Sequence, residues 1–185
     1  MGETGGRVGR AQIRNTRTPV RRSMDRRIVA WAEISILFLA LYLGVPLAGL
    51  TLDRGLSLAT LPIPLRLAGF AFLLVGLTGL AWCFSLFARA RGTPNPRLPP
   101  SRLVTSGPYA WTRNPIAGSH FLAVLGVALV VGSPGALLIV FLLGIPASLL
   151  IRHEERTLES RFGAEYRAYR ESVPRWIPRP PRRQR

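Results

Sequence analysis

Residues 28–50 read IVAWAEISILFLALYLGVPLAGL and contain a single charged side chain, Glu33. A helix needs about 20 apolar residues to cross the hydrocarbon core of a bilayer. The run therefore predicts a membrane-spanning helix. A cleaved signal peptide is the rival interpretation, because Arg21-Arg22 resembles a twin-arginine signal. Against it, the run is too long for the apolar part of a signal peptide, and no clear cleavage site follows.

Three more apolar runs follow the first, and they indicate an all-α integral membrane protein with about four transmembrane helices. The last two runs are short for a full crossing, so we expect a close helical hairpin with a tight external turn at 132–135. Residues 51–63, which include Asp53, read as a short external loop. The three runs lie at about 65–88, 115–131 and 136–151.

The remaining segments are polar. Residues 1–27 have too few apolar side chains to order by themselves, so we expect a disordered, arginine-rich tail that binds anionic lipid. Residues 89–114 are rich in Pro and Gly, which excludes a long helix. From Arg152 to about Glu171 the pattern predicts a cytoplasmic amphipathic helix. A membrane domain at 28–178 and a basic tail at 179–185 complete the organisation.

The 25 basic residues are all arginine and give a net charge of +16. Eight lie in the N-terminal tail, five in segment 89–114 and ten from Arg152 onward. With four spans, all three segments fall on one side of the membrane, which the positive-inside rule assigns to the cytoplasm. We therefore expect a multi-pass cell-membrane protein with both termini cytoplasmic. Blocks of arginine between apolar runs argue against nucleic-acid binding.

The start of the third apolar run forms a candidate anion site. Asn114 suits a helix N-cap and Pro115 the first helical position. The free N–H groups of that first turn attract a carboxylate or phosphate, and Arg113 adds a bidentate donor. Gly107 permits close backbone approach to a ligand, and Tyr109 offers a ring for stacking. The simpler interpretation is a helix start with interfacial aromatic residues and one arginine that reaches out to water.

Two carboxylates follow the fourth apolar run. The helix after Arg152 has an apolar stripe that includes Leu158 and Tyr166. Glu154 and Glu155 lie roughly 40° and 60° to either side of Leu158 at about 100° per residue, so both are expected on the inward face. Carboxylates on a packed face beside the bilayer need a partner or a function. A ribose diol or an ammonium group fits them, and so does an ion-pair network with Arg113, Arg152 or Arg156.

The two histidines leave alternatives open. His153 adjoins the carboxylates and has an ordinary pKa near neutrality, so it joins the candidate site. His120 lies about one turn into the third run and fits either a hydrogen-bonded core histidine or a catalytic base. Two histidines and one cysteine argue against a dedicated metal site.

The second half of the chain resembles the isoprenylcysteine carboxyl methyltransferase family in its broad prokaryotic sense, a group related to the membrane phospholipid N-methyltransferases. Many members carry a tyrosine two residues after the Arg-(His or Asn)-Pro motif, where this chain has Ala117. The matching pieces span about 89–178 and are, in order, Gly92-Thr93 with Pro96, Leu103-Val104, Gly107-Pro108-Tyr109, Arg113-Asn114-Pro115, Glu154-Glu155 with Leu158, Phe162-Gly163, Tyr166, Tyr169, and Val173-Pro174-Arg175 with Pro178.

The resemblance implies a methyltransferase that holds S-adenosylmethionine at the cytoplasmic ends of its membrane helices. The acceptor would be a lipophilic or membrane-associated small molecule with a carboxylate, thiol or amine. The alternative is a non-catalytic membrane module that binds anionic lipid or a protein partner. In the catalytic interpretation, Arg113, Glu155 and Arg175 act at the reacting centre, and the cofactor is bound by Gly107, Tyr109, Arg113, Asn114, Pro115, His153, Glu154, Glu155 and Tyr166.

Overall fold

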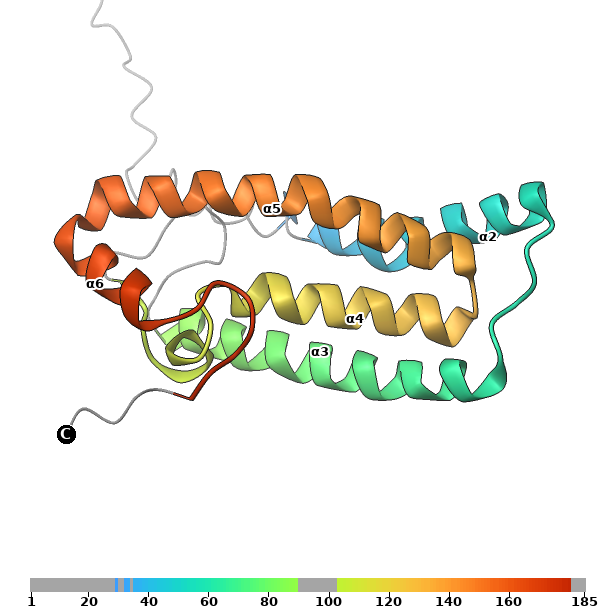
Figure 1. Ribbon diagram of the computed structural model, residues 1–185, viewed down its shortest axis with the longest axis horizontal. Helices are drawn as coiled ribbons and strands as arrows, with labels where there is room; N and C mark the ends of the chain where they lie inside the picture. Colours follow the sequence, from blue (N-terminus) through green and yellow to red (C-terminus); the bar gives the residue numbers. More distant parts are fainter. Residues whose placement is uncertain (1–28, 30–31, 34, 90–102, 181–185) are drawn as a thin grey trace, which may run out of the picture.

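The computed structural model describes residues 29, 32–33, 35–89 and 103–180, with side chains left out at 87–89. The expected N-terminal tail, the end of the basic tail and the Gly92-Thr93 and Pro96 pieces lie outside these residues. Every regular element in the described part is helical. Figure 1 shows α3, α4 and α5 running alongside one another, with α6 folded back at one end of α5.

The apolar runs form long helices, as the sequence predicts. A π-helical turn η1 (Ala40–Gly44) leads into α2 (Val45–Leu56), and with the residues before it forms an apolar helix at Ser35–Leu56. Three helices are long and apolar enough to cross a membrane, namely this one, most of α3 (Ile63–Arg89) and α5 (Pro134–Phe162). The fourth apolar helix, α4 (Pro115–Val131), has 17 residues.

Small residues bring α3 and α4 into close contact. A Cβ atom at Gly76 would lie 2.6 Å from the carbonyl oxygen of Ser119, and one at Gly126 would lie 2.8 Å from that of Gly69. Backbones approach this closely only where side chains are absent, which is a common way for helices to associate in membranes. The α3–α4 pair is therefore a tightly packed part of the bundle.

The first apolar helix and α5 pack by a similar contact at the opposite end of the bundle from α6. A Cβ atom at Gly49 would collide with the backbone of Ala136. Asp53 is buried and its Oδ1 accepts a hydrogen bond of 2.7 Å from the backbone nitrogen of Gly135. Ser133 caps the same helix end, because its Oγ accepts from the nitrogen of Ala136 at 2.9 Å. Between α2, α4 and α5 lies a core of Val45, Val124, Ala128, Ala136 and Val140.

Three boundaries differ from the sequence prediction. The first helix continues to Leu56, so Asp53 belongs to its last turn rather than to an external loop, because the carboxylate caps α5. The fourth run does not end at Ile151, since the polar residues after it continue α5 to Phe162. The amphipathic segment is then broken at Gly163, where φ is +54°, before α6 (Ala164–Ser172) begins. The bounds of α4 match the prediction at both ends.

The close α3–α4 contact predicts a steep cost for a single methyl group. Gly76→Ala places a Cβ against backbone atoms that cannot move aside, and we expect a loss of about 1–3 kcal/mol of stability. Gly55→Ala is the matched control, because a Cβ there meets no atom within 4 Å. Thermal unfolding of the two variants in detergent checks this. Equal melting temperatures for both variants would contradict the packing described.

Candidate functional site

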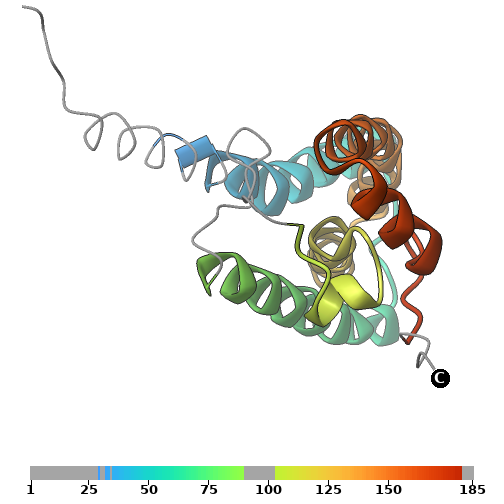
Figure 2. The ribbon, with the colours of Figure 1, turned by 90° about the vertical axis from the view of Figure 1, so that its left-hand side faces the viewer.

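The chain's C-terminal segment returns to the start of α4. Residues 173–179, here called the C-terminal strap, run beside the segment that precedes α4. The backbone nitrogen of Arg113 donates to the carbonyl of Pro174 at 2.9 Å, and that of Arg179 donates to the carbonyl of Trp111 at 3.0 Å. Figure 2 views the bundle from this end, with α6 and the strap beside the start of α4.

Side chains reinforce this backbone contact. Thr112 Oγ1 and Asn114 Nδ2 both donate to the carbonyl oxygen of Arg175, at 2.9 and 3.2 Å. Asn114 occupies the N-cap position and Pro115 the first helical position of α4, as predicted. The side chain of Asn114 does not cap the helix, however, because it binds the strap instead. Thr112 is buried and was not among the predicted site residues, because spacing cannot pair it with a residue 63 positions away.

Glu155 lies at the centre of the site. Arg175 binds it in a bidentate manner, with Nε at 3.2 Å from Oε1 and Nη2 at 2.5 Å from Oε2. Arg113 Nη2 approaches Oε1 at 3.4 Å. The side chains of Arg113 and Glu155 are each 9% exposed, whereas that of Arg175 is 34% exposed. The three predicted catalytic residues therefore meet in one ion-pair network. Of the arginines suggested as partners of the carboxylates, Arg113 is the one that binds Glu155.

Arg113 has donors to spare. Its Nε and Nη1 atoms are buried and have no hydrogen-bond partner in the part of the chain that the structure describes. Burying such donors unpaired is costly, and more so when they carry charge. Two guanidinium groups share one carboxylate here, so the network retains a net positive charge. An anionic oxygen fits a free donor of this kind and that charge.

A tyrosine cluster on α6 supports the network. Tyr166, Tyr169 and Val173 are buried together, with Leu158 packed against them. Tyr169 Oη donates to the carbonyl of Tyr109 at 2.8 Å and so holds the turn before α4. Burial raises the pKa of Tyr166 to about 12, and the nearby Glu155 adds to the rise. Tyr166 and Tyr169 are thus neutral near pH 7. Tyr169 was not among the predicted site residues.

The other predicted residues lie around this centre in different ways. Glu154 is accessible to solvent, whereas Glu155 is buried. Glu154 lies close enough to Tyr109, in the turn before α4, to interact with it electrostatically, so its inward placement stays a prediction. His153 is also exposed. Gly107 has φ +61°, and a Cβ there would meet Leu86 of α3 at 2.9 Å, so close packing on α3 explains this glycine.

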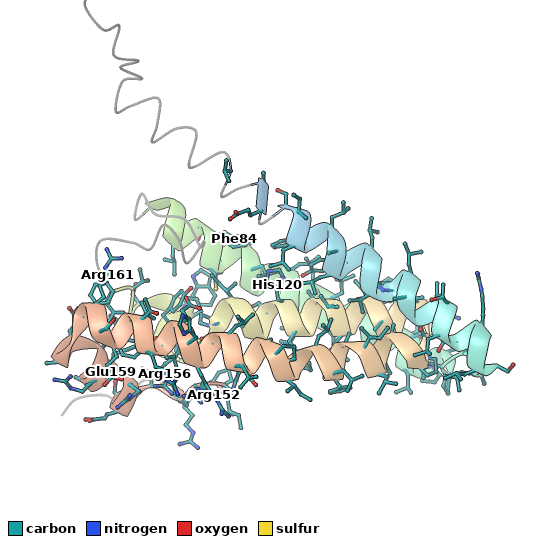
Figure 3. All side chains as sticks on the ribbon, turned by 90° about the horizontal axis from the view of Figure 1, so that it is seen from above. Phe84, His120, Arg152, Arg156, Glu159 and Arg161 are labelled. Atoms are coloured by element: carbon teal, nitrogen blue, oxygen red, sulfur yellow. The ribbon has the colours of Figure 1, made fainter. Side chains whose placement is uncertain are left out.

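Arg152 and Arg156, the other suggested partners of the carboxylates, are exposed. Figure 3 shows both on the side of α5 that faces away from α3. Among the described residues, no group of three His, Cys, Asp or Glu side chains is arranged to hold a metal ion. The site is therefore a cluster of arginines, one buried carboxylate and tyrosines at the end of the bundle.

A family model described as phospholipid methyltransferase matches residues 65–165, more than half of the chain. It belongs to the same group of membrane methyltransferases as the family that the sequence resembles. The match includes α4, Arg113 and Glu155, and it ends before the strap. No curated protein and no solved structure matches the chain.

Because two arginines share Glu155, replacing it should destabilise the protein far more than replacing Glu159, another glutamate of α5. Glu155→Gln leaves two guanidinium groups without a counter-charge, one of them buried, and should cost about 3 kcal/mol or more. Glu159→Gln removes an exposed pair with Arg170 and should cost less than about 1 kcal/mol. Thermal unfolding in detergent measures both. A Glu155→Gln variant as stable as Glu159→Gln would show that the network does not hold the strap.

Proposed function

The chain belongs to the phospholipid methyltransferase family, and on that premise we propose that it transfers a methyl group from S-adenosylmethionine to a lipophilic acceptor at the cytoplasmic face of a membrane. The free donors of Arg113 carry this proposal. They are buried, charged and unpaired among the described residues, and they adjoin the first turn of α4.

S-adenosylmethionine has a carboxylate on its methionine part, and this group fits Arg113. A carboxylate oxygen accepts a charge-assisted hydrogen bond from a guanidinium N–H, and Nε and Nη1 each offer one, on different edges of the group. The first-turn N–H groups of α4 add partial positive charge. Glu155 binds one edge of Arg113, so the guanidinium is held in place before a ligand arrives. Arg113 and Glu155 thus have different roles, recognition for the first and orientation for the second.

The remaining residues close the site from two sides. Arg175 holds the strap over Glu155, and Tyr169 fixes the turn that contains Tyr109. Exposed Glu154 adjoins the network and suits the hydroxyl groups of a ribose. When bound, the cofactor supplies an electrophilic methyl group on a sulfonium centre. The chain's own contribution is to position the partners and to exclude water, which accounts for much of the rate in such displacements.

The membrane helices support a lipophilic methyl acceptor. Three helices are apolar enough to span a bilayer, and the ion-pair network lies where the ends of α4 and α5 meet the strap. A lipophilic acceptor reaches such a site from within the bilayer, while its polar group stays at the level of the network. The arginine distribution along the chain supports a cytoplasmic position for this end.

Binding of the cofactor's carboxylate is tested with two ligands. Wild-type protein in detergent should bind S-adenosylmethionine at least about 30-fold more tightly than its decarboxylated analogue, because a buried charge pair is worth about 2 kcal/mol or more. Arg113→Gln should abolish the preference. Arg161→Gln, which changes an exposed arginine of α5, is the matched control and should keep it. Equal affinity of the wild type for both ligands would remove the main support for the proposal.

Catalysis itself is tested with a methyl-labelled cofactor and a total lipid extract. The protein should label one lipid class, and Arg113→Gln should reduce the labelling in proportion to its loss of cofactor binding. The alternative, a non-catalytic module that binds anionic lipid, predicts binding to anionic vesicles and no labelled lipid. Chromatography of the extract separates the two outcomes.

A further inference from the structure

Two adjacent apolar side chains of the C-terminal strap, Trp176 and Ile177, lie exposed at the end of the bundle. Trp176 is 44% exposed and Ile177 is 73% exposed. The two residues, here called the apolar pair, stand outside the helices in a polar segment between Arg175 and Arg179, so contact of the helices with lipid does not account for them. Adjacent exposed apolar side chains of this size mark a contact surface. The ion-pair network makes no use of either one.

Hydrogen bonds fix the strap on both sides of the apolar pair. The carbonyl of Pro174 and the backbone nitrogen of Arg179 both bond to the segment before α4, at Arg113 and Trp111 respectively. A proline precedes both Arg175 and Arg179 and restricts the backbone there. The apolar pair therefore lies in a short bulge that is already held in place, and a contact made through it costs little conformational entropy.

The position of the apolar pair relative to a membrane follows from α3. The apolar part of α3 ends at Leu86, and Trp82 lies one turn, about 6 Å, before that end. The Trp82 ring meets the Trp111 ring edge-on, with centroids 6.2 Å apart, and both side chains are 46% exposed. Tryptophan is enriched where the apolar core of a bilayer meets the headgroups. Because the strap is bonded to Trp111, the apolar pair lies near this level where α3 spans a membrane. Figure 1 shows the strap at this end of the bundle.

The charge of the strap selects the kind of surface that it fits. From residue 175 to the end of the chain there are five arginines and no acidic residue. Arg175 is engaged with Glu155, whereas Arg179 is exposed. One arginine close to an anionic leaflet strengthens membrane binding about fivefold. Tryptophan and aliphatic side chains beside arginines fit the interface of an anionic bilayer, and a soluble partner would have to enter the membrane surface to reach them.

We propose that the strap docks on the anionic leaflet of the bilayer that the helices span, with the apolar pair inserted at the interface and Arg179 bound to lipid phosphates. Arg175 immediately precedes the apolar pair, so docking also acts on the ion-pair network. A strap held on the membrane keeps Arg175 on Glu155 and keeps the segment before α4 in place. The charge of the lipid therefore regulates how firmly the strap closes the site. This inference does not depend on methyl transfer.

A label at the apolar pair tests the docking directly. Cys83 is buried, so a cysteine introduced by Ile177→Cys reacts selectively with a nitroxide label. In nanodiscs that contain phosphatidylglycerol, this label should collide more with oxygen, which dissolves in lipid, than with a water-soluble nickel chelate. In nanodiscs of phosphatidylcholine alone, the preference for oxygen should fall. Glu165→Cys, which changes an exposed residue at the start of α6, is the matched control and should favour the nickel chelate in both.

The contribution of Arg179 is measured with the same label. Arg179→Gln should weaken docking about fivefold, so that a larger fraction of phosphatidylglycerol is needed for half of the effect. Arg54→Gln, which changes an exposed arginine at the opposite end of the bundle, should leave that fraction unchanged. Equal fractions for the two variants would rule out binding of Arg179 to lipid phosphates.

Three further results with the label would overturn the proposal. A label at 177 that meets the nickel chelate as readily as the label at 165 would place the strap in water. A label shielded from both reagents would show that protein covers the apolar pair, either a second copy of this chain or a partner. The same preference for oxygen with and without phosphatidylglycerol would rule out a role for the charge of the lipid.

Hydrogen exchange tests the effect on the network without a label. The amides of Arg113 and Arg179 bond across the strap contact, and in the wild type they should exchange at least about fivefold more slowly in phosphatidylglycerol than in phosphatidylcholine. A Trp176→Ser, Ile177→Ser double variant should lose that difference. Leu58→Ser, which changes an exposed apolar residue at the opposite end of the bundle, should keep it. Equal exchange of the wild type in both lipids, or a difference that survives in the double variant, would show that docking does not hold the strap.

Discussion

The buried carboxylate of Glu155 is the constraint on which the rest of this end of the molecule depends. A charge at 9% exposure is tolerated only with counter-charges beside it, and Arg113 and Arg175 supply them from segments 42 positions before and 20 positions after it. Satisfying one carboxylate therefore brings together α5, the start of α4 and the strap. The hydrogen bonds from Thr112 and Asn114 to the strap fix the same geometry.

The helices pack more closely in some parts of the bundle than in others. At the end near Gly49 and Gly135, glycines and Ala136 bring the first helix and α5 into direct contact. Along α3 and α4, small residues do the same. Toward the ion-pair network, Ala147 of α5 is exposed, and polar groups replace apolar contacts. A tightly packed scaffold with an open, charged end suits a site that must admit both a polar cofactor and a lipid.

Much of this could be predicted from the sequence, and the reasons for the rest are physical. The bounds of α4 were predictable because Pro115 begins an apolar run and Gly132 follows its last residue. The continuation of α5 past Ile151 was not, since Arg152 to Glu155 are compatible with either a helix or a break. Helical spacing placed two glutamates inward, but only the tertiary contact with Arg113 distinguishes Glu155 from Glu154. Arg175 was identified through the family resemblance. Sequence spacing alone cannot predict that a residue of the C-terminal strap contacts α5.

The central claim is that Arg113 holds the carboxylate of the methyl donor. A structure of the protein in lipid nanodiscs with S-adenosylhomocysteine, which keeps that carboxylate, tests it most directly. We predict a carboxylate oxygen within hydrogen-bond distance of Nη1 or Nε of Arg113, with Glu155 still bound to the same guanidinium. A ligand bound elsewhere, or one whose carboxylate faces solvent while Nε and Nη1 stay unpaired, would contradict it.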